Sequence, residues 1–194
     1  MQTVPGTRDR LIDEACFALG ESGLIGLTVG SVAERAGVST ALVHYHFDTK
    51  GRLIVAAAER LAVARAERRL GALKQGAGLA ALDALWEAVL SSADGAERGY
   101  ADLVLHARRD PALAGVLAEH RTAERSAIAS RLPTLLRELG ASAAAGAEET
   151  ALVLTAVLDG LALALLAGQD VSSVRAAYDA FWLTTISAGP RSRR

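Results

Sequence analysis

Apolar residues recur at three- and four-residue spacing along most of the chain, the pattern of helices that bury one face. Short segments rich in Gly, Asp and Ser interrupt this pattern and divide the chain into about nine helices. The predicted helices run from Thr7 to about Gly23, over Val29–Ala36 and Thr40–Phe47, and onward from starts near Lys50, Leu79, Glu97, Ala112, Glu148 and Ser173. We therefore expect an all-α fold.

The predicted helices change character after residue 53. Residues 1–53 hold short helices joined by tight turns, whereas residues 54–190 hold long helices with apolar stripes. The sequence therefore predicts a small N-terminal domain of three helices and a larger C-terminal helical domain. Residues 191–194 are a basic tail, which we expect to be disordered and whose contact with DNA stays open.

Composition narrows the protein class further. The chain has 194 residues, of which 41 are Ala and 29 are Leu, the two residues that head the helix-propensity ranking. Its formal charge is -1, and its single cysteine, Cys16, excludes an intrachain disulfide. Residues 151–168 are apolar but short for a membrane span, and they contain Asp159. We expect a soluble, cytoplasmic protein with no membrane association, cofactor or bound metal.

Residues 28–50 have the pattern of a helix-turn-helix. Gly37 supplies the left-handed residue that a tight corner needs, and Ser39 is placed to cap the next helix. In that helix Val43 and Phe47 are four residues apart and share the buried face. The outward face carries Leu, His and Tyr, which suits a helix that enters the major groove of DNA.

This segment resembles the DNA-binding domain of the TetR family of transcriptional regulators. The resemblance spans Thr7 to Leu53 and rests on Thr28-Val29, Ala33, Ala36-Gly37-Val38-Ser39, Val43-His44-Tyr45-His46-Phe47 and Thr49-Lys50 with Leu53. The chain departs from the family pattern at Thr40, which is often Lys, at Leu42, which is commonly small or polar, and at Gly51-Arg52, where acidic residues are usual. These departures concern base preference rather than the fold.

The resemblance implies a DNA-contacting set within the helix-turn-helix at about 29–47 and its flanks. Thr28 and Ser39 would hold phosphates at helix starts, and Lys50 would clamp a backbone phosphate. The full set is Thr28, Ser39, Thr40, Ala41, Leu42, His44, Tyr45, His46 and Lys50. One observation weighs against DNA binding: residues 1–53 contain five basic and six acidic side chains, so the domain lacks a strong basic footprint.

The long helices suggest two further sites. Polar side chains beside Trp and Leu on the long helices predict a small-molecule pocket, lined by Trp86, Val89, Leu103, His106, Leu117, His120 and Arg121. Apolar stripes on helices more commonly mark ordinary core packing, which is the alternative. The helix from Glu148 is apolar almost all round, which predicts burial against a second copy. The expected interface residues are Leu154, Leu158, Leu161, Leu165, Tyr178, Phe181 and Trp182.

Together these features predict a sequence-specific DNA-binding regulator that acts as a homodimer. We expect a repressor that a small-molecule effector releases from a pseudo-palindromic operator. The alternative is a helical small-molecule-binding or scaffolding protein with a vestigial helix-turn-helix, which the low basicity favours. We expect no enzyme, because no catalytic grouping of residues is found. Effector identity, operator sequence, regulated genes, the number of dimers per operator and the choice between repressor and activator stay open.

Overall fold

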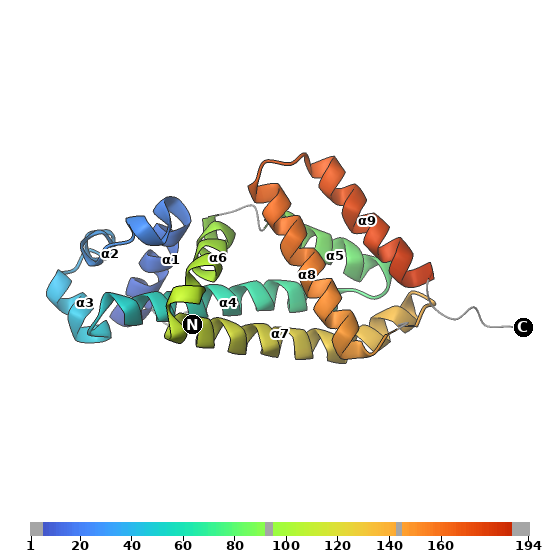
Figure 1. The fold of residues 1–194 in the computed structure, drawn as a ribbon, viewed down its shortest axis with the longest axis horizontal. Helices are drawn as coiled ribbons and strands as arrows, with labels where there is room; N and C mark the ends of the chain where they lie inside the picture. The colour runs from blue at the N-terminus through green and yellow to red at the C-terminus, as the bar shows by residue number, and fades with distance from the viewer. Residues whose placement is uncertain (1–5, 92–94, 143–144, 188–194) are drawn as a thin grey trace, which may run out of the picture. The chain divides into compact units, whose positions relative to one another are not determined.

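The computed structural model describes residues 6–91, 95–142 and 145–187, and within these ranges every regular element is helical. The elements are α1 (Thr7–Gly26), α2 (Val29–Ala36), α3 (Thr40–Phe47), α4 (Lys50–Gln75), α5 (Leu79–Leu90), α6 (Gly95–His106), η2 (Ala107–Arg109), α7 (Pro111–Glu138), α8 (Ala147–Leu166) and α9 (Val171–Ser187) (Figure 1). The all-α expectation is confirmed, and the predicted helix starts fall within two residues of those observed.

The first helix differs from its expected end. Gly23 has φ 67° and ψ -176°, which breaks the helical path where the sequence predicts a C-terminal cap. The chain then makes one more turn to Gly26. The Asp102 carboxylate accepts a hydrogen bond from the Leu24 backbone N–H at 2.5 Å, and therefore satisfies a donor that the break would leave without a partner.

The chain forms two compact units. The N-terminal unit comprises residues 1–65 and 94–120, and the C-terminal unit comprises residues 66–93 and 121–194. Each of the long helices α4 and α7 contributes residues to both units. The compact unit that holds the helix-turn-helix thus includes α6 and the start of α7. Compactness does not test which residues bind DNA, and the functional boundary expected after residue 53 therefore stays a prediction.

The core of the N-terminal unit joins the helix-turn-helix to α1 and α6. Leu11 and Leu19 of α1, Val32 of α2, Val43 of α3 and Leu103 of α6 are all at most 1% exposed. Helix α1 lies against both α2 and α6. At the α1–α6 contact the backbones approach so closely that a Cβ added to Gly20 would lie 2.5 Å from the carbonyl oxygen of Gly95.

The core of the C-terminal unit is built by α5, α8 and α9 with parts of α4 and α7. Leu85, Leu135, Leu154 and Leu158 have no exposed area. A buried charge lies among them: the Arg69 guanidinium, whose side chain is 2% exposed, bonds the Asp159 carboxylate at 2.8 Å. Burial of this charge is tolerated because a carboxylate of opposite sign neutralises it.

Helix α8 is the one helix in the described ranges that is long and apolar enough to cross a membrane. One third of its apolar window is buried inside the chain. Its inner face, which includes Leu154 and Leu158, packs in the core of the C-terminal unit. The length and apolar composition of α8 therefore reflect a partly buried core helix.

Candidate nucleic-acid interface

Helix α3 is anchored by one face and exposes the other. Val43 and Phe47 are 1% and 4% exposed and hold the helix in the core of the N-terminal unit. Thr40, Ala41 and His44 are exposed on the opposite side, and Tyr45 is 81% exposed. A large aromatic side chain held away from the core by a firmly anchored helix is available to contact a partner molecule.

The turn before α3 is fixed by backbone and hydroxyl hydrogen bonds. Gly37 has φ 65° and ψ 35°, the left-handed conformation that its sequence position predicts. The Val38 N–H donates to the Ala33 carbonyl at 2.9 Å, and the Ser39 hydroxyl accepts the Leu42 N–H at 3.3 Å. The orientation of α3 relative to α2 is therefore set by local bonds as well as by packing.

The N-terminus of α2 carries a capping box. The Thr28 hydroxyl accepts the Ser31 N–H at 3.0 Å, and the Ser31 hydroxyl oxygen accepts the Thr28 N–H at 3.1 Å. The capping oxygens of Thr28 and Ser39 serve as acceptors, and both residues are exposed. The Thr28 hydroxyl also donates to the Ser31 hydroxyl oxygen at 3.1 Å. It would have to exchange this bond to donate to a phosphate oxygen, which is the role that the resemblance implies for Thr28 and Ser39.

The exposed ring of His44 has a defined hydrogen-bonding state. Its Nδ1 lies 3.1 Å from the backbone carbonyl of Asp48. Since a carbonyl oxygen only accepts hydrogen bonds, Nδ1 carries the proton. In the neutral ring Nε2 is then an acceptor that is not used by this bond. An acceptor on the exposed face of α3 suits the exocyclic amino group of adenine or cytosine in the major groove.

The junction between α3 and α4 is a strained, tight turn. Asp48 has φ 62° and ψ -54°, and the Thr49 N–H donates to the Phe47 carbonyl at 2.6 Å, which together define a classic γ-turn. The Thr49 hydroxyl accepts the Arg52 N–H at 3.2 Å. This turn places Lys50 in the first turn of α4, directly after α3, and the positive end of the helix dipole adds to its charge.

The four acidic residues of α1 form ion pairs within the unit. Two arginines each contact two carboxylates of α1: Arg35 contacts Glu14 and Glu21, and Arg60 contacts Asp9 and Asp13. The guanidinium of Arg8 lies 5.2 Å from the ring centroid of Phe47, which brings the start of α1 beside the end of α3. Two guanidinium groups against four carboxylates leave this cluster a formal charge of -2, whereas Arg8 adds positive charge beside α3.

The predicted DNA-contacting residues differ in how far their side chains are exposed to solvent. Six of its members are exposed: Thr28, Ser39, Thr40, Ala41, His44 and Tyr45. Leu42, His46 and Lys50 are partly buried. The His46 ring packs edge-on against Tyr45, with centroids 5.3 Å apart, so we assign it the role of holding Tyr45 in place. Arg8 is an additional candidate for phosphate contact, which only the packing of α1 against α3 reveals.

The predicted ligand-pocket residues are divided between the two units. Leu103 and Leu117 lie in the core of the N-terminal unit, and Trp86 and Val89 lie in the core of the C-terminal unit. The polar members have partners within their own units: His106 Nδ1 lies 2.9 Å from the Asp102 carbonyl, and Arg121 bonds Asp159 at 2.9 Å. His120, the last member, is partly buried. The pocket itself stays a prediction.

Most of the expected interface residues are buried within the chain itself. Leu154, Leu158, Leu161, Tyr178 and Trp182 are at most 8% exposed, and Leu165 and Phe181 are partly buried against the same core. The five buried side chains have little surface left for a second copy, whereas Leu165 and Phe181 keep some, so the interface stays a prediction. The apolar side chains that α8 leaves exposed lie on its opposite face and include Leu152, Val153, Ala156 and Leu163.

The polar residues of α8 are divided between buried and exposed positions. Thr155 is 7% exposed and the partly buried Asp159 bonds the buried Arg69, whereas Glu148 and Glu149 at the start of the helix are exposed. The ion pair with Arg69 therefore ties one polar position of α8 to the core, while part of the apolar surface stays exposed. The sequence showed that the helix is apolar nearly all round, but it did not show that an arginine of α4 takes up the inner polar position.

Residues 11–57 match the family model of bacterial regulatory proteins, tetR family. The HTH-type transcriptional regulator BetI of Brucella anthropi is 42% identical over 57 residues, a match that spans 29% of this chain and 29% of that protein. The match thus spans less than a third of the length of this curated relative.

The structural likeness extends over the whole chain. A transcriptional regulator from Rhodococcus sp. RHA1 has a TM-score of 0.79 and 25% identity, over 97% of this chain and all of the other. The multidrug binding protein EbrR, in complex with imidazole, has a TM-score of 0.65 and 28% identity, over 98% of each chain. A regulator from Saccharomonospora viridis shares the fold, with a TM-score of 0.74 and 22% identity over 90% of this chain.

Proposed function

Because the chain belongs to the TetR family of helix-turn-helix transcriptional regulators, we propose that it binds a pseudo-palindromic operator as a homodimer and is released by a small-molecule effector. In this proposal residues 1–53 bind DNA, and residues 54–190 bind the effector and the second copy. The family is one of regulators rather than enzymes. The observation that carries the proposal is the exposed face of α3, which is held in place because the opposite face of the helix is buried.

Helix α3 has the dimensions and chemistry of a helix that reads DNA. An α-helix with its side chains is about 10–12 Å across, which fits the major groove of about 12 Å. Tyr45 and His44 offer hydrogen-bonding groups to base edges, and Ala41 offers an apolar contact to a thymine methyl group. Thr28, Ser39 and Lys50 flank this face with groups that bind phosphate, so affinity and specificity are supplied by different residues.

A second copy would pack on the outer face of α8. Leu152, Ala156 and Leu163 are exposed there, and Gly160 has open space where a side chain would lie. Small residues between larger apolar ones let a neighbouring helix approach closely. Burial of this face in a two-fold dimer would give two α3 helices, which must lie about 34–36 Å apart to reach successive major grooves.

Effector binding is supported by the relative EbrR, which is 28% identical over nearly the whole chain and is described as binding multiple drugs. The predicted pocket residues are Trp86, Val89, Leu103, His106, Leu117, His120 and Arg121. Helix α4 begins with Lys50 beside α3, and its later residue Leu73 is buried in the core of the C-terminal unit. A displacement of α4 would therefore change the placement of α3 and its spacing in the dimer.

The decisive experiment is a gel shift with the DNA that flanks the gene of this protein, at several salt concentrations. Lys50→Ala should weaken binding to all sequences about equally and lower the salt slope by about 0.9 per protomer. Tyr45→Ala should instead change the order of preference among operator variants, because it removes a base contact. The matched control is Lys74→Ala, which removes the only other lysine of the chain from an exposed position in the C-terminal unit.

The alternative of a helical binding protein with a vestigial helix-turn-helix rests on the five basic and six acidic residues of positions 1–53. Absence of any gel shift at low salt, with the folded dimer intact, would favour it. An effector identified by thermal-shift screening tests the second half of the proposal. If it weakens operator binding tenfold, about 1.4 kcal/mol, it must bind the operator complex tenfold more weakly than free protein. Equal affinities would refute release by that effector.

A further inference from the structure

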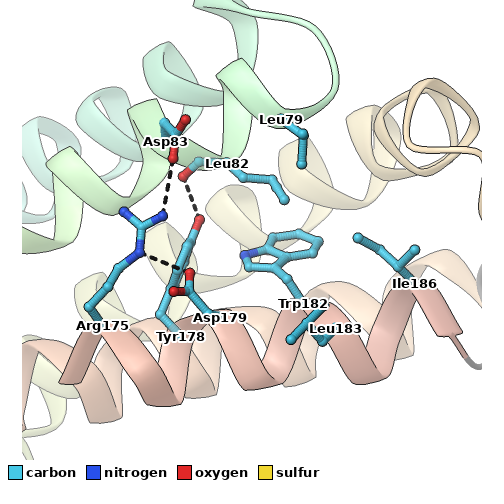
Figure 2. Close-up of a pocket in the computed structure, with 9 residues that line it drawn as sticks. All are labelled: Leu79, Leu82, Asp83, Arg175, Tyr178, Asp179, Trp182, Leu183 and Ile186. Carbon is cyan, nitrogen blue, oxygen red and sulfur yellow. Dashed lines mark hydrogen bonds and ion pairs between the residues drawn. The ribbon is translucent and has the colours of Figure 1, made fainter. Parts of the chain in front are cut away.

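A groove of about 430 Å³ opens between α5 and α9 within the C-terminal unit. Its lining contains none of the residues assigned to DNA or effector binding, but it includes Tyr178 and Trp182 of the expected dimer interface. Its walls come from Leu79, Leu82 and Asp83 of α5 and from six residues of α9. Figure 2 shows that the two ends differ: charged side chains gather at one end, and apolar side chains gather at the other. The volume falls within the range of small-molecule sites, about 300–1,000 Å³.

The charged end holds two carboxylates and one guanidinium. Arg175 bonds Asp83 at 3.1 Å and Asp179 at 2.8 Å (Figure 2). Its guanidinium carbon also lies 5.3 Å from the ring centroid of Trp86 and 5.7 Å from that of Tyr178. This end thus holds a cation between carboxylates and aromatic faces, and its formal charge is still -1. Its residual potential attracts a second cation and repels an anion.

The apolar end exposes large side chains to solvent. Leu79 and Leu183 are 69% and 66% exposed, and they lie on either side of the Trp182 ring with Ile186 beyond it (Figure 2). Trp182 itself is 3% exposed and forms a rigid floor. Exposed leucines on both walls of one groove leave apolar area that a bound apolar group would bury.

We infer that this groove is a binding site for an amphipathic organic cation. The ammonium head group lies against the outer oxygens of Asp83 and Asp179, and the apolar part lies over Trp182 between Leu79 and Leu183. Arg175 shares the carboxylates with the ligand and repels its charge. The inference goes beyond the proposed function, because the organic cation would bind this groove in the free protein whether or not the protein binds DNA or is released from it.

A second copy of the chain fits this groove less well than a small molecule. Successive residues of a helix are rotated by about 100°, so Asp179 lies roughly opposite Ala177 and Thr184 on α9, and Leu183 lies between these two faces. The small exposed residues Ala177, Ala180 and Thr184 suit close packing of helices, whereas the groove side carries charges. An acidic groove on both copies of a symmetric dimer would also set like charges against each other.

The test uses n-decyltrimethylammonium, below its micelle concentration, as the probe. Binding is followed by the fluorescence of Trp86 and Trp182, the only two tryptophans, and by isothermal titration calorimetry. n-Decyl sulfate has the same tail and the opposite charge. We expect saturable binding of the cation that is at least about tenfold tighter than that of the sulfate. Equal affinities would overturn the inference, because the groove would then recognise only the tail.

Variants locate the site. Asp83→Asn and Asp179→Asn should each weaken cation binding by about threefold, as expected for exposed charge pairs. Arg175→Gln should strengthen it by a similar factor, since it removes a competing positive charge. Leu183→Gln should weaken binding of both probes. The matched control is Glu149→Gln, which removes an exposed carboxylate of the same unit outside the groove.

The Arg175→Gln result separates ligand binding from a purely structural role. If Arg175 only ties α9 to α5, its loss would leave cation affinity unchanged or lower it. Either outcome in a variant with an unchanged circular dichroism spectrum would refute the assigned site. Asp83 is 69% exposed and Asp179 48% exposed, so the asparagine variants preserve the fold and remain informative.

Discussion

The close contact of α1 with α6 makes a sharp prediction for Gly20. A Cβ at this position would lie 2.5 Å from the Gly95 carbonyl oxygen and 2.6 Å from its carbonyl carbon, about 1 Å inside ordinary van der Waals distance. Both neighbours are backbone atoms, so no side-chain rotation relieves the overlap. Gly20→Ala must therefore separate the two helices or shift the chain at Gly95.

The expected magnitude follows from two opposing effects. Overpacking of a well-packed contact costs about 1–3 kcal/mol. Replacement of a helical glycine by alanine returns about 0.5–1 kcal/mol through the unfolded state. The difference between the two ranges is a net destabilisation of about 0–2.5 kcal/mol, with a central value of about 1.3 kcal/mol. For a chain of this size we expect the midpoint of thermal unfolding to fall by roughly 2–8 °C.

The assay is thermal unfolding followed by circular dichroism, at fixed protein concentration because dimerisation would contribute to stability. Gly115→Ala is the matched control, since its Cβ would meet nothing within 4 Å in the interior of α7. The control should be as stable as the wild type or more stable. If Gly20→Ala behaves like the control, the helices do not approach as described and the reasoning fails.

Three further predictions concern local strain, the thiol and the dimer. Asp48→Gly should raise the unfolding midpoint by a few degrees, because glycine adopts φ 62° without strain and the exposed ion pair with Arg52 contributes little. Burial raises the pKa of the Cys16 thiol to about 12, so at pH 8 native protein should react with a thiol reagent at least about tenfold more slowly than protein unfolded in guanidinium. Leu163→Glu should give a folded monomer in light scattering, because Leu163 is 59% exposed on the outer face of α8. Leu158→Glu should instead unfold the protein, since that side chain has no exposed area.

Specific results would contradict each of these. A lower midpoint for Asp48→Gly would mean that the γ-turn is stabilised by the aspartate side chain itself. Equal thiol reactivity in native and unfolded protein would contradict the burial of Cys16. The raised pKa also fixes the sign of the pH effect: the unfolded thiol ionises first, so stability should fall as the pH rises above about 9. A dimeric Leu163→Glu variant would exclude this face of α8 as the interface.

Local signals in the sequence were strong wherever a few adjacent residues determine the backbone. Gly37 required a left-handed turn and adopts one, and Ser39 caps α3 as its hydroxyl permits. Val43 and Phe47, four residues apart, face the core as helical spacing requires. The helix-turn-helix is readable because its caps, turn and buried pair all lie within about 20 residues, so each constraint acts on its neighbours in the chain.

Tertiary structure decided which face of each long helix is covered. Helix α8 is apolar nearly all round, and spacing alone cannot select its inner side. Arg69 of α4 lies 90 residues before Asp159, yet their ion pair ties this position of α8 to the core, and Leu152 and Leu163 lie exposed. The α5–α9 groove likewise needs Asp83 and Arg175, 92 residues apart, to meet.

The sequence by itself determined the helices, the caps of α2 and α3 and the exposed face of α3, because these depend on residues close together in the chain. Only the tertiary structure decided the ion pair of Asp159 on α8 with Arg69, the glycine contact of α1 with α6, the position of Arg8 beside α3 and the charged groove on α9. Each of these joins distant segments, and a periodic apolar pattern is compatible with many such pairings. The physical reason is that hydrophobic burial is non-directional, whereas the ion pairs and close backbone contacts that select one pairing are specific to a few atoms.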